Sequence, residues 1–204
     1  MKLRFLFLIC ATLTGAPGAM AAEDKSKPQI LRYRGYSVDL STMAEADVPA
    51  VTKAVSAQID MVQRVGLNGA ALLFFHSLPL KVEPHLKGFL GTYDKGVINL
   101  APWQIDTHDP TLLHEYMHAY HAQKIHKGYD NPEIDAFFRD AAAKPRYEGN
   151  NAAYFLTNNR EFFAVTATIY LNGWQPYNRP YSRAAIKAAQ PEYYKFLGTL
   201  FGAR

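Results

Sequence analysis

Cysteine is almost absent from this chain of 204 residues, which contains only Cys10. Cys10 lies in an apolar run, residues 5–13, that follows a basic start and precedes the small-residue pattern Ala19-Met20-Ala21. These features are typical of a secretory signal peptide, which we place at residues 1–21. An uncleaved anchor is the alternative, but the run is too short to span a bilayer stably. The mature chain would contain no cysteine, so disulfides cannot contribute to its stability.

Long apolar stretches and a strong excess of one charge are also missing. After residue 21, no apolar run is long enough to cross a membrane. The full chain has 22 basic and 18 acidic residues, and removing Lys2 and Arg4 with the signal leaves 20 against 18, a net charge of +2 with histidine neutral. Without a basic cluster, the sequence does not have the pattern of a nucleic-acid-binding protein. We therefore expect an exported protein, secreted or periplasmic, without membrane or nucleic-acid partners.

The remaining residues, 22–204, contain no internal repeat, and a chain of about 180 residues suits a single domain. Hydrophobic periodicity predicts an α+β fold. We expect strands at residues 30–40, 78–84 and 97–101. We expect helices from Val48 to about Gly66, from Asp109 to about Gly128, from Asn131 to about Lys144, from Asn159 to Gly173, and in two pieces between Ser182 and Phe201 that break at Pro191. The run 70–75 is compatible with either a strand or a buried helix, and loops are expected at 88–96 and 147–157.

Within the helix expected after Asp109, the run from Leu112 to His121 contains the pattern His-Glu-x-x-His. Residues four apart lie one turn above each other on one helix face, so His114 and His118 can direct both imidazoles at one ion. Two histidines and one carboxylate form a zinc-binding set that leaves a fourth position open for water. Glu115, on the edge of the same face, is placed to take a proton from that water. The pattern predicts a site for one Zn²⁺ per chain.

The third ligand must come from another part of the chain, and Glu161 is the candidate. Its helical neighbours Ala164, Val165 and Thr168 are uncharged, so its carboxylate must be solvated, paired or bound to metal. The ordinary alternative stays open, because the helix dipole favours an acid in the first turn. Competing acids lie in more polar surroundings: Asp130, Glu133, Asp135, Asp140 and Glu148.

The other histidines lack ligand spacing. His121 shares the helix face of His114, but it lies about 10 Å farther along the axis, so we expect it to pack or to support a ligand. The longer metzincin pattern requires glycine where His121 stands and histidine where Lys124 stands, so that group is excluded. Surface or loop positions are expected for the rest: His76, His85, His108 and His126.

Taken together, His114-Glu115-x-x-His118, Tyr154 and the run Asn159–Ala164 resemble the gluzincin metallopeptidases, in particular the catalytic domain of anthrax lethal factor and the clostridial Pro-Pro endopeptidases. The likeness covers roughly residues 91–171. It implies a zincin-like domain over 22–204, with a small mixed sheet, an active-site helix and a later helix that carries the third ligand, Glu161. Tyr154 precedes Glu161 by seven residues, as a tyrosine does in that group. Val165 departs from the pattern, because many gluzincins have an acid there that orients a zinc histidine.

The resemblance implies a zinc-dependent endopeptidase in which Glu115 is the general base and Tyr154 stabilises the developing oxyanion. A peptide or protein substrate would bind along Val97–Ala101, taken as the edge strand beside the metal helix. Two other functions stay open. One is a zincin-fold binding module or effector without catalysis, although the intact Glu115 argues against it. The other is a zinc amidase that acts on cell-wall peptides.

Overall fold

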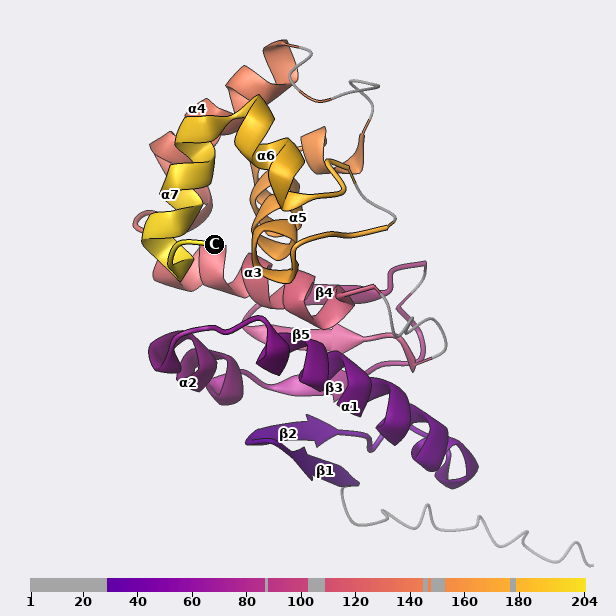
Figure 1. Cartoon of the computed structure of the whole chain (residues 1–204). Coiled ribbons are helices and arrows are strands. Elements are labelled where there is room, and N and C mark those ends of the chain that lie inside the picture. The colour runs from indigo at the N-terminus through magenta and orange to yellow at the C-terminus, as the bar shows by residue number, and fades with distance from the viewer. Residues whose placement is uncertain (1–28, 87, 103–108, 145–146, 148–152, 177–178) are drawn as a thin grey trace, which may run out of the picture.

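The computed structural model describes residues 29–86, 88–102, 109–144, 147, 153–176 and 179–204. The predicted signal peptide, His108 and Glu148 lie outside these ranges. Within them, the chain forms an α+β fold in which a small sheet and two helices make one half and most of the later helices make the other (Figure 1). None of the helices in these ranges combines the length and the apolar character that a membrane span requires.

Among the described residues, five strands form one mixed sheet in the order β1-β2-β3-β5-β4. Their bounds are Ile30–Tyr33 (β1), Tyr36–Asp39 (β2), Leu80–Val82 (β3), Gly91–Asp94 (β4) and Val97–Leu100 (β5). The three central strands, β2, β3 and β5, are parallel, whereas β1 and β4 pair antiparallel with β2 and β5. The central strands bury apolar side chains in the core, among them Val38, Leu80, Ile98 and Leu100.

Two hairpin turns divide the strands, and the sequence patterns predicted neither of them. The single strand expected over residues 30–40 is two strands, because Arg34 and Gly35 both have positive φ, 47° and 83°, and reverse the chain. The expected glycine-rich loop contains β4, which returns into β5 through Lys95 and Gly96, with φ of 47° and 86°. Two-residue turns with positive φ at both positions match the twist of the strands that they join.

The strand order corrects the predicted position of Val97–Ala101. That segment was expected at the edge of the sheet, but β5 lies between β3 and β4. The edges among the described strands are β1 and β4, and β4 is the one that packs against the metal-ligand helix, α3. The segment is a strand as predicted, but strand order depends on tertiary pairing, which periodicity along the chain does not report.

The helices follow the predicted pattern more closely. Their bounds are Val48–Arg64 (α1), Gly69–Ser77 (α2), Thr111–Lys124 (α3), Pro132–Ala143 (α4), Asn159–Asn172 (α5), Arg183–Ala189 (α6) and Pro191–Phe201 (α7). The ambiguous run 70–75 is helical. Side chains that accept backbone hydrogen bonds cap four of the helices: Asn68, Asn131, Asn158 and Ser182. α3 ends at Lys124 rather than at Gly128, and a short 3-10 turn, Gly128–Asp130, follows.

α3 lies between the two halves of the molecule (Figure 1). It packs against α5 in one half and against α1, β4 and β5 in the other. Its apolar residues are fully buried and hold it there: Leu112, Leu113, Tyr116 and Met117. α5 is buried along most of its length, including Phe162, Phe163 and Val165. A helix fixed on both sides in this way can present side chains with little freedom to move.

A glutamine from α1 caps the start of α3. Gln58 Oε1 accepts a hydrogen bond from the backbone N–H of Leu112 at 3.0 Å, and Gln58 Nε2 donates to the carbonyl oxygen of Asp109 at 2.7 Å. Asp109 was expected to be the cap, but Pro110 takes the capping position and no side chain of the local segment caps the helix. The missing local cap is replaced by a tertiary contact.

Candidate metal centre

Two helices bring the predicted ligands together. His114 and His118 lie one turn apart on the face of α3 that meets α5. Glu161 lies in the first turn of α5, where Asn158 accepts hydrogen bonds from the backbone N–H groups of Arg160 and Glu161 at 3.0 Å each. His114 Nε2 and His118 Nε2 are 3.0 Å apart, and Glu161 Oε2 is 3.4 Å from each of these nitrogens. Side chains from distant parts of the sequence therefore form one cluster.

The cluster has the geometry of a metal site. Tetrahedral ligands at about 2.0–2.1 Å from zinc lie about 3.4 Å from one another, close to the three observed separations. Glu161 Oε2 is buried and makes no hydrogen bond, which is costly for a carboxylate oxygen unless an ion satisfies it. Within the described ranges, no other group of histidine, cysteine and acidic side chains has this arrangement. The donor set fits a divalent ion, although by itself it does not distinguish zinc from other transition metals.

Charge coupling within the cluster keeps Glu161 ionised. Burial by itself raises the pKa of Glu161, but its contacts with His114 and His118 outweigh burial and hold the pKa well below its usual range. Burial lowers the pKa of both histidines. For His114 the nearby carboxylates raise the pKa overall, whereas for His118 burial prevails. Metal binding requires an ionised carboxylate and neutral imidazoles, and the shifts of Glu161 and His118 are in that direction, whereas a metal ion would have to displace a proton from His114.

Glu115 is buried beside the cluster, with 5% of its surface exposed. Burial raises its pKa to about 7, although the charge of His114 and a hydrogen bond from the backbone N–H of Tyr93 oppose the shift. A carboxyl group in this range can accept and release a proton near neutral pH. On the other side stands Gly91, where a Cβ would lie 2.8 Å from Glu115 Cγ and 3.0 Å from Oε1. β4 approaches Glu115 so closely that a Cβ at residue 91 would force β4 or the Glu115 side chain to move.

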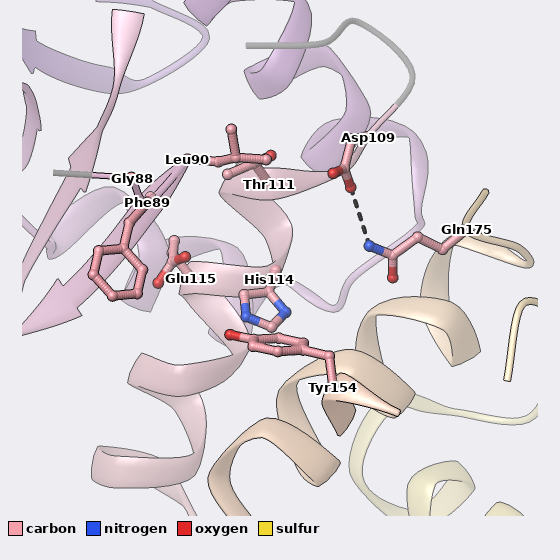
Figure 2. Close-up of a pocket in the computed structure, with 10 residues that line it drawn as sticks. Gly88, Phe89, Leu90, Asp109, Thr111, His114, Glu115, Tyr154 and Gln175 are labelled. Carbon is pink, nitrogen blue, oxygen red and sulfur yellow. Dashed lines mark hydrogen bonds between the residues drawn. The ribbon is translucent and has the colours of Figure 1, made fainter. Parts of the chain in front are cut away.

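Tyr154 faces the cluster from a short 3-10 helix, Tyr154–Leu156, and is 50% exposed. Its ring centroid lies 6.4 Å from that of His114. Figure 2 shows its hydroxyl directed past His114 toward the side of Glu115. Burial and the charge of Glu161 raise the pKa of Tyr154 above its ordinary value. The hydroxyl therefore stays protonated at neutral pH and can donate a hydrogen bond.

Two cavities adjoin the cluster, and His114, Glu115 and Tyr154 line both of them. The first, which we call the Gln175 cavity, has a volume of about 320 Å³ and extends toward Gln175 near the start of α3 (Figure 2). The second, the Arg160 cavity, has a volume of about 260 Å³ and extends along β4 toward Arg160. Open space therefore continues from the cluster in two directions.

The other predicted candidates lie outside the cluster. His121 is fully buried between the rings of Tyr129 and Phe163, at centroid distances of 5.0 and 4.7 Å, so it packs in the core as expected. Burial lowers the pKa of His121 to about 4. Val165 is fully buried, so the acid that orients a zinc histidine in many gluzincins has no counterpart at this position. The described competing acids do not join the ligand group: Asp130, Glu133, Asp135 and Asp140.

Sequence reasoning missed the surroundings of the cluster. Gln175 Nε2 donates a hydrogen bond to Asp109 Oδ1 at 3.0 Å, and both residues line the Gln175 cavity. Gln175 lies in an irregular segment after α5, where no local pattern marks it. Gly91 was visible only as one glycine of an expected loop. The roles of both residues depend on tertiary contacts, whereas His114 and His118 follow a spacing rule along one helix.

Comparison with protein-family models and with curated proteins gave no match. The resemblance to gluzincins therefore rests on the motif residues alone.

Proposed function

We propose that the protein is an exported zinc-dependent endopeptidase of the gluzincin type, with His114, His118 and Glu161 as the ligands of one Zn²⁺. The observation that carries this proposal is the convergence of three ligand atoms within 4.8 Å of one another beside the buried carboxyl group of Glu115. Structural zinc sites usually fill all four positions with protein side chains. A zinc ion held by three protein ligands would have one position left for water, and Glu115 lies beside the three ligands.

The residues around the cluster suit the hydrolysis of a peptide bond. A zinc ion held there would supply Lewis acidity, which lowers the pKa of water and polarises a carbonyl group. Glu115 takes a proton from the attacking water and passes it to the leaving amine, a double role that suits a pKa of about 7. The neutral hydroxyl of Tyr154 donates a hydrogen bond to the carbonyl oxygen as negative charge develops on it.

The edge strand and the two cavities support cleavage within a chain rather than at its end. Among the described strands, β4 has a neighbour on one side, β5, so an extended peptide can pair with its outer backbone groups. β4 thus replaces Val97–Ala101 as the proposed substrate strand. The Gln175 and Arg160 cavities extend from the cluster in different directions and can take residues on both sides of the scissile bond.

Glu115→Gln tests this proposal, because glutamine nearly keeps the shape of the side chain but cannot act as the base. Zinc-loaded wild type and variant would digest a peptide library, with products identified by mass spectrometry. We expect internal cleavage by wild type, a loss of about 10²- to 10⁴-fold in the variant, and one zinc per chain in both. The matched control is Glu133→Gln, which changes an exposed glutamate outside the cluster.

Two outcomes would contradict the endopeptidase. Cleavage at the wild-type rate by Glu115→Gln would remove the proposed base and favour a contaminating protease or a different role for the site. The absence of library cleavage by zinc-loaded wild type would favour a binding module. Purified cell wall digested in parallel separates the amidase, which would release wall peptides and leave the library intact.

A further inference from the structure

The Arg160 cavity has a permanent positive charge in its wall. Of the described residues that line this cavity and the Gln175 cavity, Arg160 alone is a lysine or an arginine. Arg160 is exposed, and within the described part of the chain it forms no ion pair and its guanidinium donates no hydrogen bond. Its N–H groups are therefore available to a ligand that enters the cavity.

Tyr129, which lines the same cavity, holds the guanidinium in place. Arg160 Cζ lies 4.3 Å from the centroid of the Tyr129 ring, within the range of a cation–π contact. Tyr129 is itself fixed at two points: its hydroxyl donates to the carbonyl oxygen of His118 at 3.3 Å, and its own carbonyl oxygen accepts from Asn159 Nδ2 at 3.0 Å. A guanidinium that lies over an aromatic ring keeps the N–H groups at its edge free to donate. Because the contact already restricts the side chain, less conformational entropy is lost when a ligand binds.

Arg160 stands where a positive charge is unfavourable for the protein alone. It lies in the first turn of α5, where the helix dipole disfavours a cation. It also precedes the ligand Glu161 directly, and its charge opposes protonation of His118, which means that it repels positive charge at the cluster. Neither α5 nor the candidate metal centre is stabilised by this residue, whereas a carboxylate bound in the cavity would offset both effects.

We propose that the Arg160 cavity is a specificity subsite for an acidic substrate side chain, aspartate or glutamate, and that Arg160 is the residue that selects it. The guanidinium N–H groups donate to the substrate carboxylate, which arginine can bind through two parallel hydrogen bonds. Residues 91–93 of β4 line the same cavity, so a peptide paired with β4 runs along its wall. This inference rests on the proposed peptidase function, because it assigns the substrate that the cluster would cleave.

Peptides with an amidated C-terminus that differ only by glutamate or glutamine at each position in turn test the subsite, because the two side chains differ in charge and hardly in shape. At one position we expect kcat/KM to favour glutamate by about 10-fold, the low end for a charged hydrogen bond, because solvent screens the exposed Arg160. Arg160→Gln should abolish this preference. Arg160→Lys should keep part of it, since lysine retains the charge but not the planar fork. Zinc content should stay unchanged in both variants, because the guanidinium contacts Tyr129 and not a ligand.

Arg32→Gln is the matched control, because it removes the same charge from an exposed arginine on β1, at the edge of the described sheet opposite β4. It should keep the preference for glutamate. Equal kcat/KM for glutamate and glutamine at every position, or a preference that survives in Arg160→Gln, would overturn the subsite. Peptides with a free C-terminus provide a further test. If they are cleaved faster than amidated ones, only at the last residue and without a preference for glutamate, Arg160 binds the terminal carboxylate and the assignment to a side chain is wrong.

A binding measurement separates this inference from the peptidase proposal. Monohydroxamates of succinic, glutaric and adipic acid, and the corresponding terminal amides, would be titrated calorimetrically into zinc-loaded protein. The hydroxamate group binds zinc, and each acid differs from its amide in the charge at the free end. Tighter binding of at least one acid than of its amide, in wild type and Arg32→Gln but not in Arg160→Gln, supports the subsite even if no peptide is cleaved. Equal binding of every acid and its amide, or no binding of any compound, would overturn it.

Discussion

Replacing Gly91 with alanine tests how closely β4 approaches the proposed base. The added Cβ would lie 2.8 Å from Glu115 Cγ, 3.0 Å from Glu115 Oε1 and 3.1 Å from Thr111 Cγ2. Carbon atoms in contact prefer about 3.5–4.0 Å, so β4 and α3 must separate by roughly 0.5–1 Å, or the Glu115 side chain must leave its position. Overpacking of this kind costs about 1–3 kcal/mol of folding free energy.

Two measurements follow from this displacement. Calorimetry should show Tm lowered by about 2–4 °C for each kcal/mol, or about 2–12 °C in total. Peptide cleavage should show kcat reduced by about 100-fold, because a misplacement of about 1 Å in a catalytic group has an effect of this size. Zinc should stay at one per chain, because the closest contacts of residue 91 are with Glu115 and Thr111 and not with a ligand.

Gly69→Ala is the control, because a Cβ at Gly69 meets no heavy atom within 4 Å. It should leave both Tm and kcat near their wild-type values. Wild-type Tm and kcat in Gly91→Ala would refute the close approach of β4 to Glu115. A lower Tm with unchanged kcat would keep the packing argument but remove Glu115 from the chemistry.

Three further predictions concern the third ligand, the tyrosine and the buried histidine. Elemental analysis should show that Glu161→Ala no longer binds one zinc per chain, whereas Glu133→Ala still does. The reverse result would place the third ligand on α4. Tyr154→Phe should lower kcat by roughly 10- to 1,000-fold, with zinc content and Tm nearly unchanged. The control Tyr181→Phe changes a tyrosine outside both cavities and should keep full activity. Full activity in Tyr154→Phe would remove Tyr154 from the mechanism. The pKa of His121 is about 4 in the folded protein and about 6.5 in the unfolded chain. Between these pH values the unfolded chain binds more protons than the folded protein. The free energy of unfolding therefore falls by roughly 3 kcal/mol as the pH drops from 6.5 to 4. Urea denaturation of the chelator-treated proteins should show this fall in the free energy of unfolding for wild type but not for His121→Leu. The same pH dependence in both proteins would contradict the prediction.

The ligands on α3 were predictable because helix geometry is local. A spacing of four residues places His114 and His118 on one face wherever the helix lies. Glu161 was harder to assign, because an acid in a first turn has an ordinary explanation in the helix dipole, and only the resemblance raised it above the alternatives. Gln175 and Asp109 are 66 residues apart, so their contact depends on how α5 and the following segment pack against the start of α3.

The fold shows the same division between local and tertiary information. Helix starts were predicted well where a capping side chain precedes the helix, as Asn131 and Asn158 do. The hairpins were missed because their turns contain Arg34 and Lys95, which adopt positive φ without belonging to the residue types that usually mark such turns. The edge position of β4 could not be predicted, because pairing energies between strands, rather than the pattern within one strand, determine sheet order.

The two hydrogen bonds of Gln58 have a consequence for how the metal site is held before an ion binds. One side chain from α1 occupies both a carbonyl oxygen and an N–H group at the start of α3, so a shift of α3 by one residue would break both bonds at once. The Leu112 amide hydrogen should then exchange with solvent only when α1 and α3 separate, at a rate close to that of global unfolding, although first-turn amides usually exchange by fraying. An arrangement of this kind preorganises the two histidines, so that binding an ion does not have to order the helix that carries them.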